Sequence, residues 1–235
     1  MKGLFVVARR EIRSYFDSPV GYVVVTLFLL LSGWFFANSL FLQGVASVRT
    51  LFDMTVVFFM FFVPAITMGT FAEERRAGTI ELLLTLPVRD WQVIAGKLIA
   101  AFGLLITAIA LTLVYVVIVA NLGDIDGGAT FGGYLGMALL GLACASIGIF
   151  ASSLTRNQIV AFIIAFVIIF AMFMLDKVTI FVPGSLAGVL QFLSLDFHYQ
   201  NLLRGVVDTR DLIYFASVVL LSSLLTAYHL SKRPE

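Results

Sequence analysis

Long apolar runs alternate with short polar connections along the whole chain. Six of these runs are long enough to cross a bilayer as an α-helix, which takes roughly 17–25 residues. They cover residues 20–42, 54–71, 93–120, 131–154, 159–175 and 212–230. We therefore predict that residues 1–235 form a single transmembrane domain, an all-α polytopic membrane protein with six transmembrane helices.

Basic residues are divided unequally between the two sides of these spans. An even number of spans places both termini on one side, and eleven of the fifteen lysines and arginines fall there. These eleven are Lys2, Arg9, Arg10, Arg13, Arg75, Arg76, Arg89, Lys97, Arg156, Lys232 and Arg233. The other four are Arg49, Lys177, Arg204 and Arg210. Because basic residues are enriched in cytoplasmic connections, we predict cytoplasmic N- and C-termini.

Residues 1–18 have a different pattern, in which apolar positions recur at helical spacing. The apolar positions are Leu4, Phe5, Ala8, Ile12, Tyr15 and Phe16. Arg9, Arg10 and Arg13 fall mainly on the opposite helical face. Such a helix lies in the membrane interface, with its apolar face at the acyl boundary and its arginines at anionic headgroups. We predict an amphipathic interfacial helix rather than a signal peptide, because the apolar run that follows is too long for one.

The densest polar stretch, residues 72–91, separates the second and third apolar runs. It opens with four consecutive charges, which require water or a protein partner. They are Glu73, Glu74, Arg75 and Arg76. Gly78 and Thr79 then offer a helix break and an N-cap, and Pro87 closes the segment. Residues 80–86 between them predict a cytoplasmic helix of about two turns that is too apolar to lie uncovered.

The sequence EERRAGTIELLLTLPV, residues 73–88, resembles the cytoplasmic loop of ABC-2 type permeases. In that loop an acidic and basic pair, Gly-Thr, a Glu, a Leu run and a Pro follow in this order. Within the family, the chain is most similar to the gliding-motility-associated short permeases. This similarity lies in its opening VARREIRSYFDSPVGYVV and in its late segment DFHYQNLLRGVVDTRDLIYF. The resemblance implies the permease subunit of an ABC exporter in the cytoplasmic (inner) membrane of a bacterium or archaeon.

The resemblance also implies how such a subunit is driven. In the family this loop is a coupling helix that docks on a separate ATPase, and the N-terminal helix is an elbow beside it. The residues expected to make the contact are Glu73, Glu74, Arg75, Arg76, Gly78, Thr79, Glu81, Leu83 and Pro87. Expected partners are two ATPase copies, which hold ATP and Mg²⁺, a second copy of this chain or a similar permease, and an accessory protein in the periplasm or membrane. A topology anchor without a coupling role is an equally good interpretation of the N-terminal helix.

Two features inside the spans bear on movement and packing. Pro64 removes a backbone donor and predicts a kink in the second span, which makes it a candidate lever toward the coupling segment. The fourth span carries small residues at four-residue spacing, which permit close approach of another helix. That helix could belong to the same subunit or to a second one.

The capping pattern of residues 176–211, the connection on the outer side, predicts two short amphipathic helices. Ser194 is a predicted N-cap and Gly205 a predicted C-cap for a helix over 195–204, which follows an apolar piece too short to cross. The two helices fit a re-entrant hairpin of the kind that the family has near its extracellular gate, or a passive lid. His198 lies within the second helix, two residues after Asp196, and the two side chains point apart, so we predict no metal site there.

Composition and motifs exclude several classes. With 61% apolar and 12% charged residues and a mean hydropathy of +1.06, the chain is an integral membrane protein. A net charge of +1 argues against nucleic-acid binding. Gly96-Lys97 is not followed by Ser or Thr, so the chain has no P-loop and is not predicted to be an enzyme or to hold a cofactor. The alternatives are a non-transporting, ATP-coupled membrane scaffold that acts on envelope proteins and, less favoured, a membrane enzyme or secondary carrier.

Overall fold

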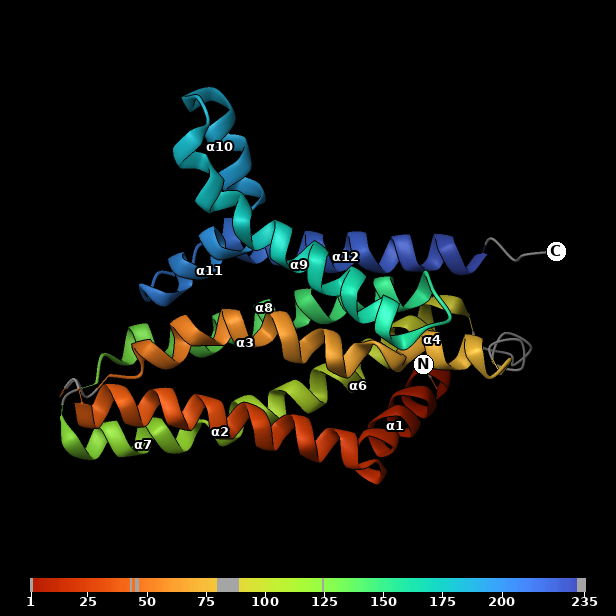
Figure 1. Cartoon of the computed structure of the whole chain (residues 1–235), viewed down its shortest axis with the longest axis horizontal. Coiled ribbons are helices and arrows are strands. Elements are labelled where there is room, and N and C mark those ends of the chain that lie inside the picture. Colours follow the sequence, from red (N-terminus) through yellow and green to blue (C-terminus); the bar gives the residue numbers. More distant parts are fainter. Residues whose placement is uncertain (1, 43, 45–46, 80–88, 124, 232–235) are drawn as a thin grey trace.

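The protein is helical throughout the part of the chain that its computed structural model describes, residues 2–42, 44, 47–79, 89–123 and 125–231 (Figure 1). The helices are α1 (Lys2–Asp17), α2 (Pro19–Leu42), α3 (Arg49–Thr67), α4 (Gly69–Arg76), α6 (Asp90–Leu111), α7 (Leu113–Leu122), α8 (Gly127–Ser153), α9 (Gln158–Val178), η1 (Thr179–Phe181), α10 (Gly184–Leu193), α11 (Leu195–Leu203) and α12 (Thr209–Ser231).

Six stretches of these helices are long and apolar enough to cross a membrane, which confirms the predicted number of spans. They are Gly21–Leu42, Arg49–Arg76, Asp90–Leu122, Gly127–Ser153, Gln158–Phe181 and Thr209–Ser231. The second span comprises α3 and α4, and the third comprises α6 and α7. The predicted boundaries differ mainly because polar residues at the ends of the apolar runs continue the helices.

Helix α8 lies at the centre of the bundle and is the most buried of the six spans. Its small residues face other helices of the same chain. A Cβ on Gly136 would lie 3.0 Å from the ring of Tyr199, and one on Gly141 would lie 3.1 Å from the ring of Phe59. At Gly148 an added Cβ would overlap the side chain of Thr67. The small-residue face therefore permits close packing within the subunit, one of the two alternatives left by the sequence.

The second span is interrupted at Met68, where α3 ends and α4 begins. Pro64 lies inside α3 and has no N–H to donate, while its own carbonyl accepts a 2.8 Å bond from the Met68 backbone. The interruption in helical structure therefore comes one turn after the proline. A bend of the second span at Met68 would lie between the core of the bundle and the charged residues of α4.

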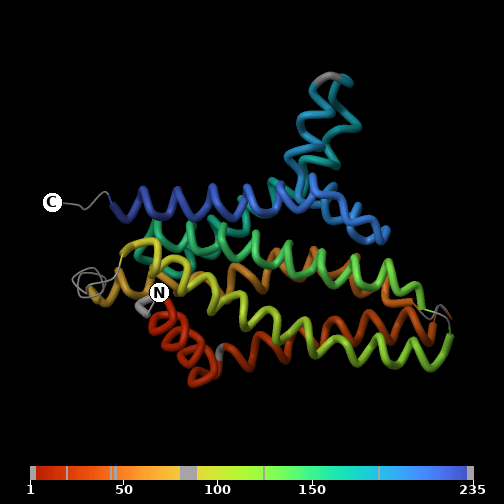
Figure 2. The backbone as a smooth tube through the Cα atoms, turned by 180° about the vertical axis from the view of Figure 1, so that it is seen from behind, coloured from red at the N-terminus to blue at the C-terminus, as the bar shows by residue number. Residues whose placement is uncertain are grey.

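The bundle has two distinct ends. At one end, called here the α4 end, lie α4, helix α1 at a steep angle to α2, and the last turns of α12 (Figure 1). Toward the opposite end, called the α10 end, the outer part of α9, η1 and α10 project sideways from the bundle, as Figures 1 and 2 show from opposite sides. The two predicted short helices of residues 176–211 are α10 and α11.

Candidate functional site

The charged stretch that opens the predicted coupling segment forms the C-terminal half of α4. The helix stops at Gly78, which has a φ of +69° that favours glycine, and the Thr79 backbone donates to the Glu74 carbonyl at 3.0 Å. This arrangement is a Schellman C-cap, so the predicted helix break at Gly78 is confirmed. The predicted helix over 80–86, with Glu81 and Leu83, and the closing Pro87 lie outside the described residues.

A buried lysine of the third span connects this stretch to α1. Lys97, in the second turn of α6, is 1% exposed. Its Nζ donates to Glu74 Oε1 at 2.8 Å, to Glu11 Oε1 at 3.1 Å and to the Thr70 carbonyl at 2.9 Å. The nitrogen also lies 5.1 Å from the centre of the Phe71 ring. We call Lys97, Glu11, Glu74, Thr70 and Phe71 the Lys97 cluster.

The Lys97 cluster brings together three separate elements of the chain. Glu11 comes from α1, Glu74 from α4 and Lys97 from α6. An ammonium group out of water is costly unless it is paired and hydrogen-bonded, and here three acceptors satisfy its three donor positions. Two carboxylates face one lysine, so the cluster retains a net negative charge when all three groups are ionised.

Helix α1 packs closely on α6 beside this cluster. A Cβ on Gly96 would lie 2.8 Å from Val7 and 3.2 Å from the Ala8 backbone nitrogen, so glycine at this position lets the two helices meet. Tyr15 of α1 also reaches α3, where its hydroxyl donates to the Ile66 carbonyl at 3.1 Å. Burial raises the pKa of Tyr15 to about 12, so this hydroxyl keeps its proton at physiological pH.

Helix α8 holds the start of α4 from the other side. The Ser152 hydroxyl accepts from the backbone nitrogens of Phe71 and Ala72, each at 3.0 Å, and donates to the Met68 carbonyl at 2.8 Å. The free backbone groups at the interruption of the second span are therefore satisfied by a side chain from another helix. One side of α4 is fixed by Ser152 and another by Lys97.

A cleft of about 310 Å³ separates α1 from the α4 region and borders the Lys97 cluster. Its lining is both polar and apolar and comes from five helices, α1, α3, α4, α6 and α9. The lining includes Arg10, Glu11, Ser14, Tyr15, Glu73, Glu74, Lys97 and Gln158. The carboxylates of Glu11 and Glu74, each 16% exposed, therefore lie at the edge of the bundle rather than deep in its core.

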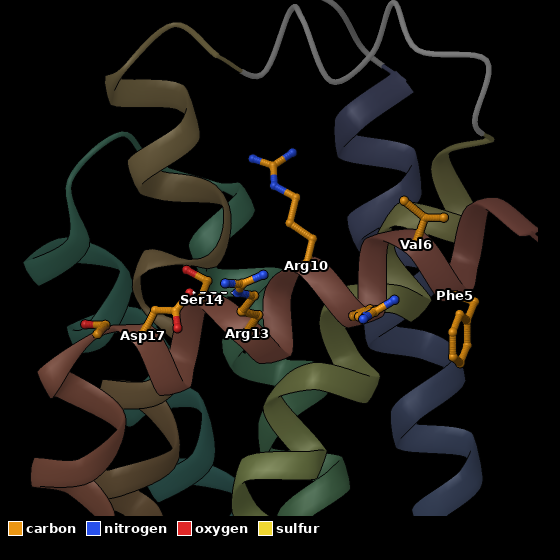
Figure 3. Close-up of a pocket in the computed structure, with 8 residues that line it drawn as sticks. Phe5, Val6, Arg10, Arg13, Ser14 and Asp17 are labelled. Atoms are coloured by element: carbon orange, nitrogen blue, oxygen red, sulfur yellow. Dashed lines mark hydrogen bonds and ion pairs between the residues drawn. The ribbon is translucent and has the colours of Figure 1, made fainter.

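The arginines of α1 lie on its exposed surface, along a shallow hollow drawn in Figure 3. Arg10 and Phe5 point in opposite directions from the helix (Figure 3). Arg13 pairs with Asp17 at 3.1 Å across exposed positions, and Arg9 is also exposed. The predicted apolar face is divided: Ala8 is buried against the protein, whereas Phe5 is 70% exposed. This division fits a helix that packs on the bundle along one side and meets lipid along another.

At the α10 end, His198 pairs with a residue that the sequence did not identify. Its Nδ1 lies 2.6 Å from Asp211 Oδ1 of α12, and its Nε2 lies 2.9 Å from the Phe192 carbonyl of α10. Both ring nitrogens of this buried imidazole therefore have a hydrogen-bond partner. Tyr214 stacks on the imidazole at 3.9 Å between ring centres.

Asp196, the acid two residues before His198, binds a different residue. Its Oδ2 accepts from Lys177 of α9 at 2.6 Å. Gly205 follows α11 with a φ of +79°, as its prediction as a C-cap requires. Ser194 occupies the N-cap position of α11, but its buried hydroxyl caps no backbone nitrogen, so the predicted side-chain cap is wrong. The early turns of α11 are held by the Asp196 and His198 contacts instead.

The candidate site thus includes several residues that the sequence analysis did not select. Lys97 was recognisable as a charge at the edge of an apolar run, a position at which an ionic partner is expected. The identity of the partners depends on which helices meet, because Glu11 and Lys97 are 86 residues apart. Ser152 and Asp211 carried no comparable signal, since serine is common in membrane helices and an acid near a helix start is ordinary.

Comparison with known protein families gives a match over most of the chain. A family model described as ABC-2 family transporter protein covers residues 36–224. The matched range includes all of the polar segment between the second and third spans and both helices of the α10 end. No curated protein matches the chain.

Proposed function

Because the chain belongs to the ABC-2 transporter family, we propose that a separate ATPase drives it through the polar segment at the α4 end. Family membership and six membrane-spanning helices make the chain a multi-pass permease subunit of an ABC transporter. The observation that carries the proposal is the family match, which extends over most of the chain and across this segment. The α4 end then faces the cytoplasm, in agreement with the excess of arginines there.

The contact with the ATPase is made by residues 73–87 in this proposal. Glu73 and Arg76 are exposed at the end of α4, and so are Gly78 and Thr79 after its cap. These residues are free to meet a soluble protein. Glu81, Leu83 and Pro87 continue the contact surface, with Glu73 and Arg76 forming ion pairs at its edge and Glu74 and Arg75 supporting it from the helix.

The complete transporter contains two ATPase copies and two permeases, the second being another copy of this chain or a similar one. ATP and Mg²⁺ bind to the ATPase. We assign export as the direction of transport, which is supported by the resemblance of residues 73–88 to exporter permeases. The membrane is the cytoplasmic membrane of a bacterium or archaeon, with both termini in the cytoplasm.

The direct test is purification of a tagged chain from native membranes in mild detergent, followed by identification of the proteins that accompany it. We expect a P-loop ATPase in the wild-type preparation. Glu81→Arg should remove the ATPase, because it reverses a charge at the centre of the proposed contact. The matched control is Asp208→Arg, an equal charge reversal at an exposed position of the α10 end, which should retain the ATPase.

Two results would contradict the proposal. One is a wild-type chain that carries no ATPase under several gentle conditions. The other is an ATPase that binds Glu81→Arg as well as it binds the wild type, because the contact would then lie elsewhere. The scaffold alternative is tested in vesicles that hold the reconstituted complex together with an inner-membrane extract as the source of substrate. If the ATPase binds as proposed but these vesicles show no ATP-dependent export, the chain is an ATP-coupled scaffold.

A further inference from the structure

The Lys97 cluster has a cost that simple anchoring of α1 does not explain. A buried ion pair is often no more stabilising than apolar side chains of similar volume, because each charge must leave water. Apolar contacts between α1 and α6 already exist at Gly96, Val7 and Ala8. The lysine adds a fixed geometry, because its nitrogen atom binds three acceptors that lie on two other elements.

The acceptors belong to two helices, and only α4 leads into the proposed ATPase contact. Glu74 and the Thr70 carbonyl lie on α4, which ends in the proposed contact residues, whereas Glu11 lies on α1, which precedes the first span. A displacement of α4 relative to α1 would separate Glu74 from Glu11 and leave at least one carboxylate without Lys97. Such a separation is costly at buried positions, so the cluster resists it.

We propose that Lys97 is a positioning residue that makes α1, α4 and the first turns of α6 move as one unit when the ATPase acts on the α4 end. The inference rests on the proposed function. It gives α1 a coupling role in place of the topology anchor that the sequence left equally open. The Tyr15 bond to the Ile66 carbonyl adds a second link between α1 and the second span, on the other side of the interruption at Met68.

The test measures the distance between α1 and α4 in the assembled transporter. The buried Cys144 is first replaced in Cys144→Ala, and spin labels are attached in Val6→Cys, which is exposed on α1, and Ala77→Cys, which is exposed after α4. A second pair, Ala77→Cys with Val207→Cys at the α10 end, reports whether α4 moves at all. Distances are compared between the nucleotide-free complex and the complex trapped with ATP and vanadate.

The decisive variant is Glu11→Leu, which removes the ionic link of α1 and leaves Lys97 paired with Glu74, so no charge in the cluster is left without a partner. Its control is Asp17→Leu, which removes an acid from an exposed position on the same helix. If Glu11→Leu does not yield folded protein, Glu11→Gln replaces it, because the amide keeps the size of the side chain and loses its charge.

In the wild type and in Asp17→Leu we expect the distance from residue 77 to residue 207 to shift on trapping, while the distance from residue 6 to residue 77 stays unchanged. In Glu11→Leu the distance from residue 6 to residue 77 should shift or broaden as well. Any of three results overturns this inference alone. They are a shift between residues 6 and 77 in the wild type, no movement of residue 77 relative to residue 207, and a Glu11→Leu variant identical to the wild type. Absence of the ATPase from the wild-type complex overturns the proposed function, and this inference with it.

Discussion

The α4 end and the α10 end each contain a buried ionic group, but the two groups join different kinds of elements. At the α4 end, Lys97 binds Glu11 and Glu74, which are 86 and 23 residues away. At the α10 end, His198 and Asp211 are 13 residues apart and Lys177 and Asp196 are 19 apart. The first group ties distant parts of the chain together, whereas the second stabilises one local unit. Long-range ionic contacts suit a region that transmits movement, and local ones suit a region that keeps its shape.

The largest expected effect is that of Lys97→Met. This variant leaves Glu11 and Glu74 near each other without a cation, and breaking a buried pair in this way costs about 3–5 kcal/mol. Thermal unfolding in detergent should show a large loss of stability. The double variant Lys97→Met with Glu74→Gln should recover part of it by removing one of the two carboxylates. A single variant as stable as the wild type would mean that the lysine is not buried between the two acids.

Asp211→Asn should have the next largest effect and tests the α10 end. The amide can make only a neutral hydrogen bond to His198, in place of the 2.6 Å bond to the carboxylate. The expected cost is about 1–3 kcal/mol, measured by thermal unfolding. Asp208→Asn, at an exposed position nearby, serves as the control. ATPase binding should be retained, because the change is local to the α10 end, and loss of binding would contradict the separation of the two regions.

Ser152→Ala returns to the α4 end and tests how firmly the interruption of the second span is held. The change removes the acceptor of two backbone donors and should cost about 1 kcal/mol, as the loss of a helix cap does. Hydrogen exchange at Phe71 and Ala72 should accelerate. The control is Ser146→Ala on the same helix, whose hydroxyl donates to the Ala143 carbonyl within α8. Equal exchange in both variants would show that α4 does not depend on α8.

The smallest effect is expected for Asp176→Asn. Asp176 pairs with Lys177 at 3.4 Å and Lys177 is about half exposed, so water screens this pairing, and Lys177 retains its contact with Asp196. We expect a loss of about 0.5 kcal/mol by thermal unfolding. A loss as large as that for Lys97→Met would remove the energetic difference between the two ends.

The helices of this protein follow from local patterns, whereas the contacts between them do not. Long apolar runs predict the six spans because a bilayer imposes a minimum helix length. Gly78 and Gly205 predict helix ends because few other residues adopt their backbone conformation. The partners of Lys97 and His198 follow only from the arrangement of helices in space. Ser194 shows the converse error, in which a good local capping signal is not used because the helix is held by tertiary contacts.

The long separation within the Lys97 cluster also sets an order of events during synthesis. At a rate of 5–20 residues per second, the ribosome adds Lys97 about 4–17 seconds after Glu11. Until then, neither Glu11 nor Glu74 has the lysine of this cluster to bind. The ionic attachment of the first helix therefore forms only after the start of the third span has been translated. A nascent chain interrupted before that point would have its N-terminal helix linked to the second span by the Tyr15 bond to Ile66, without the ionic contact.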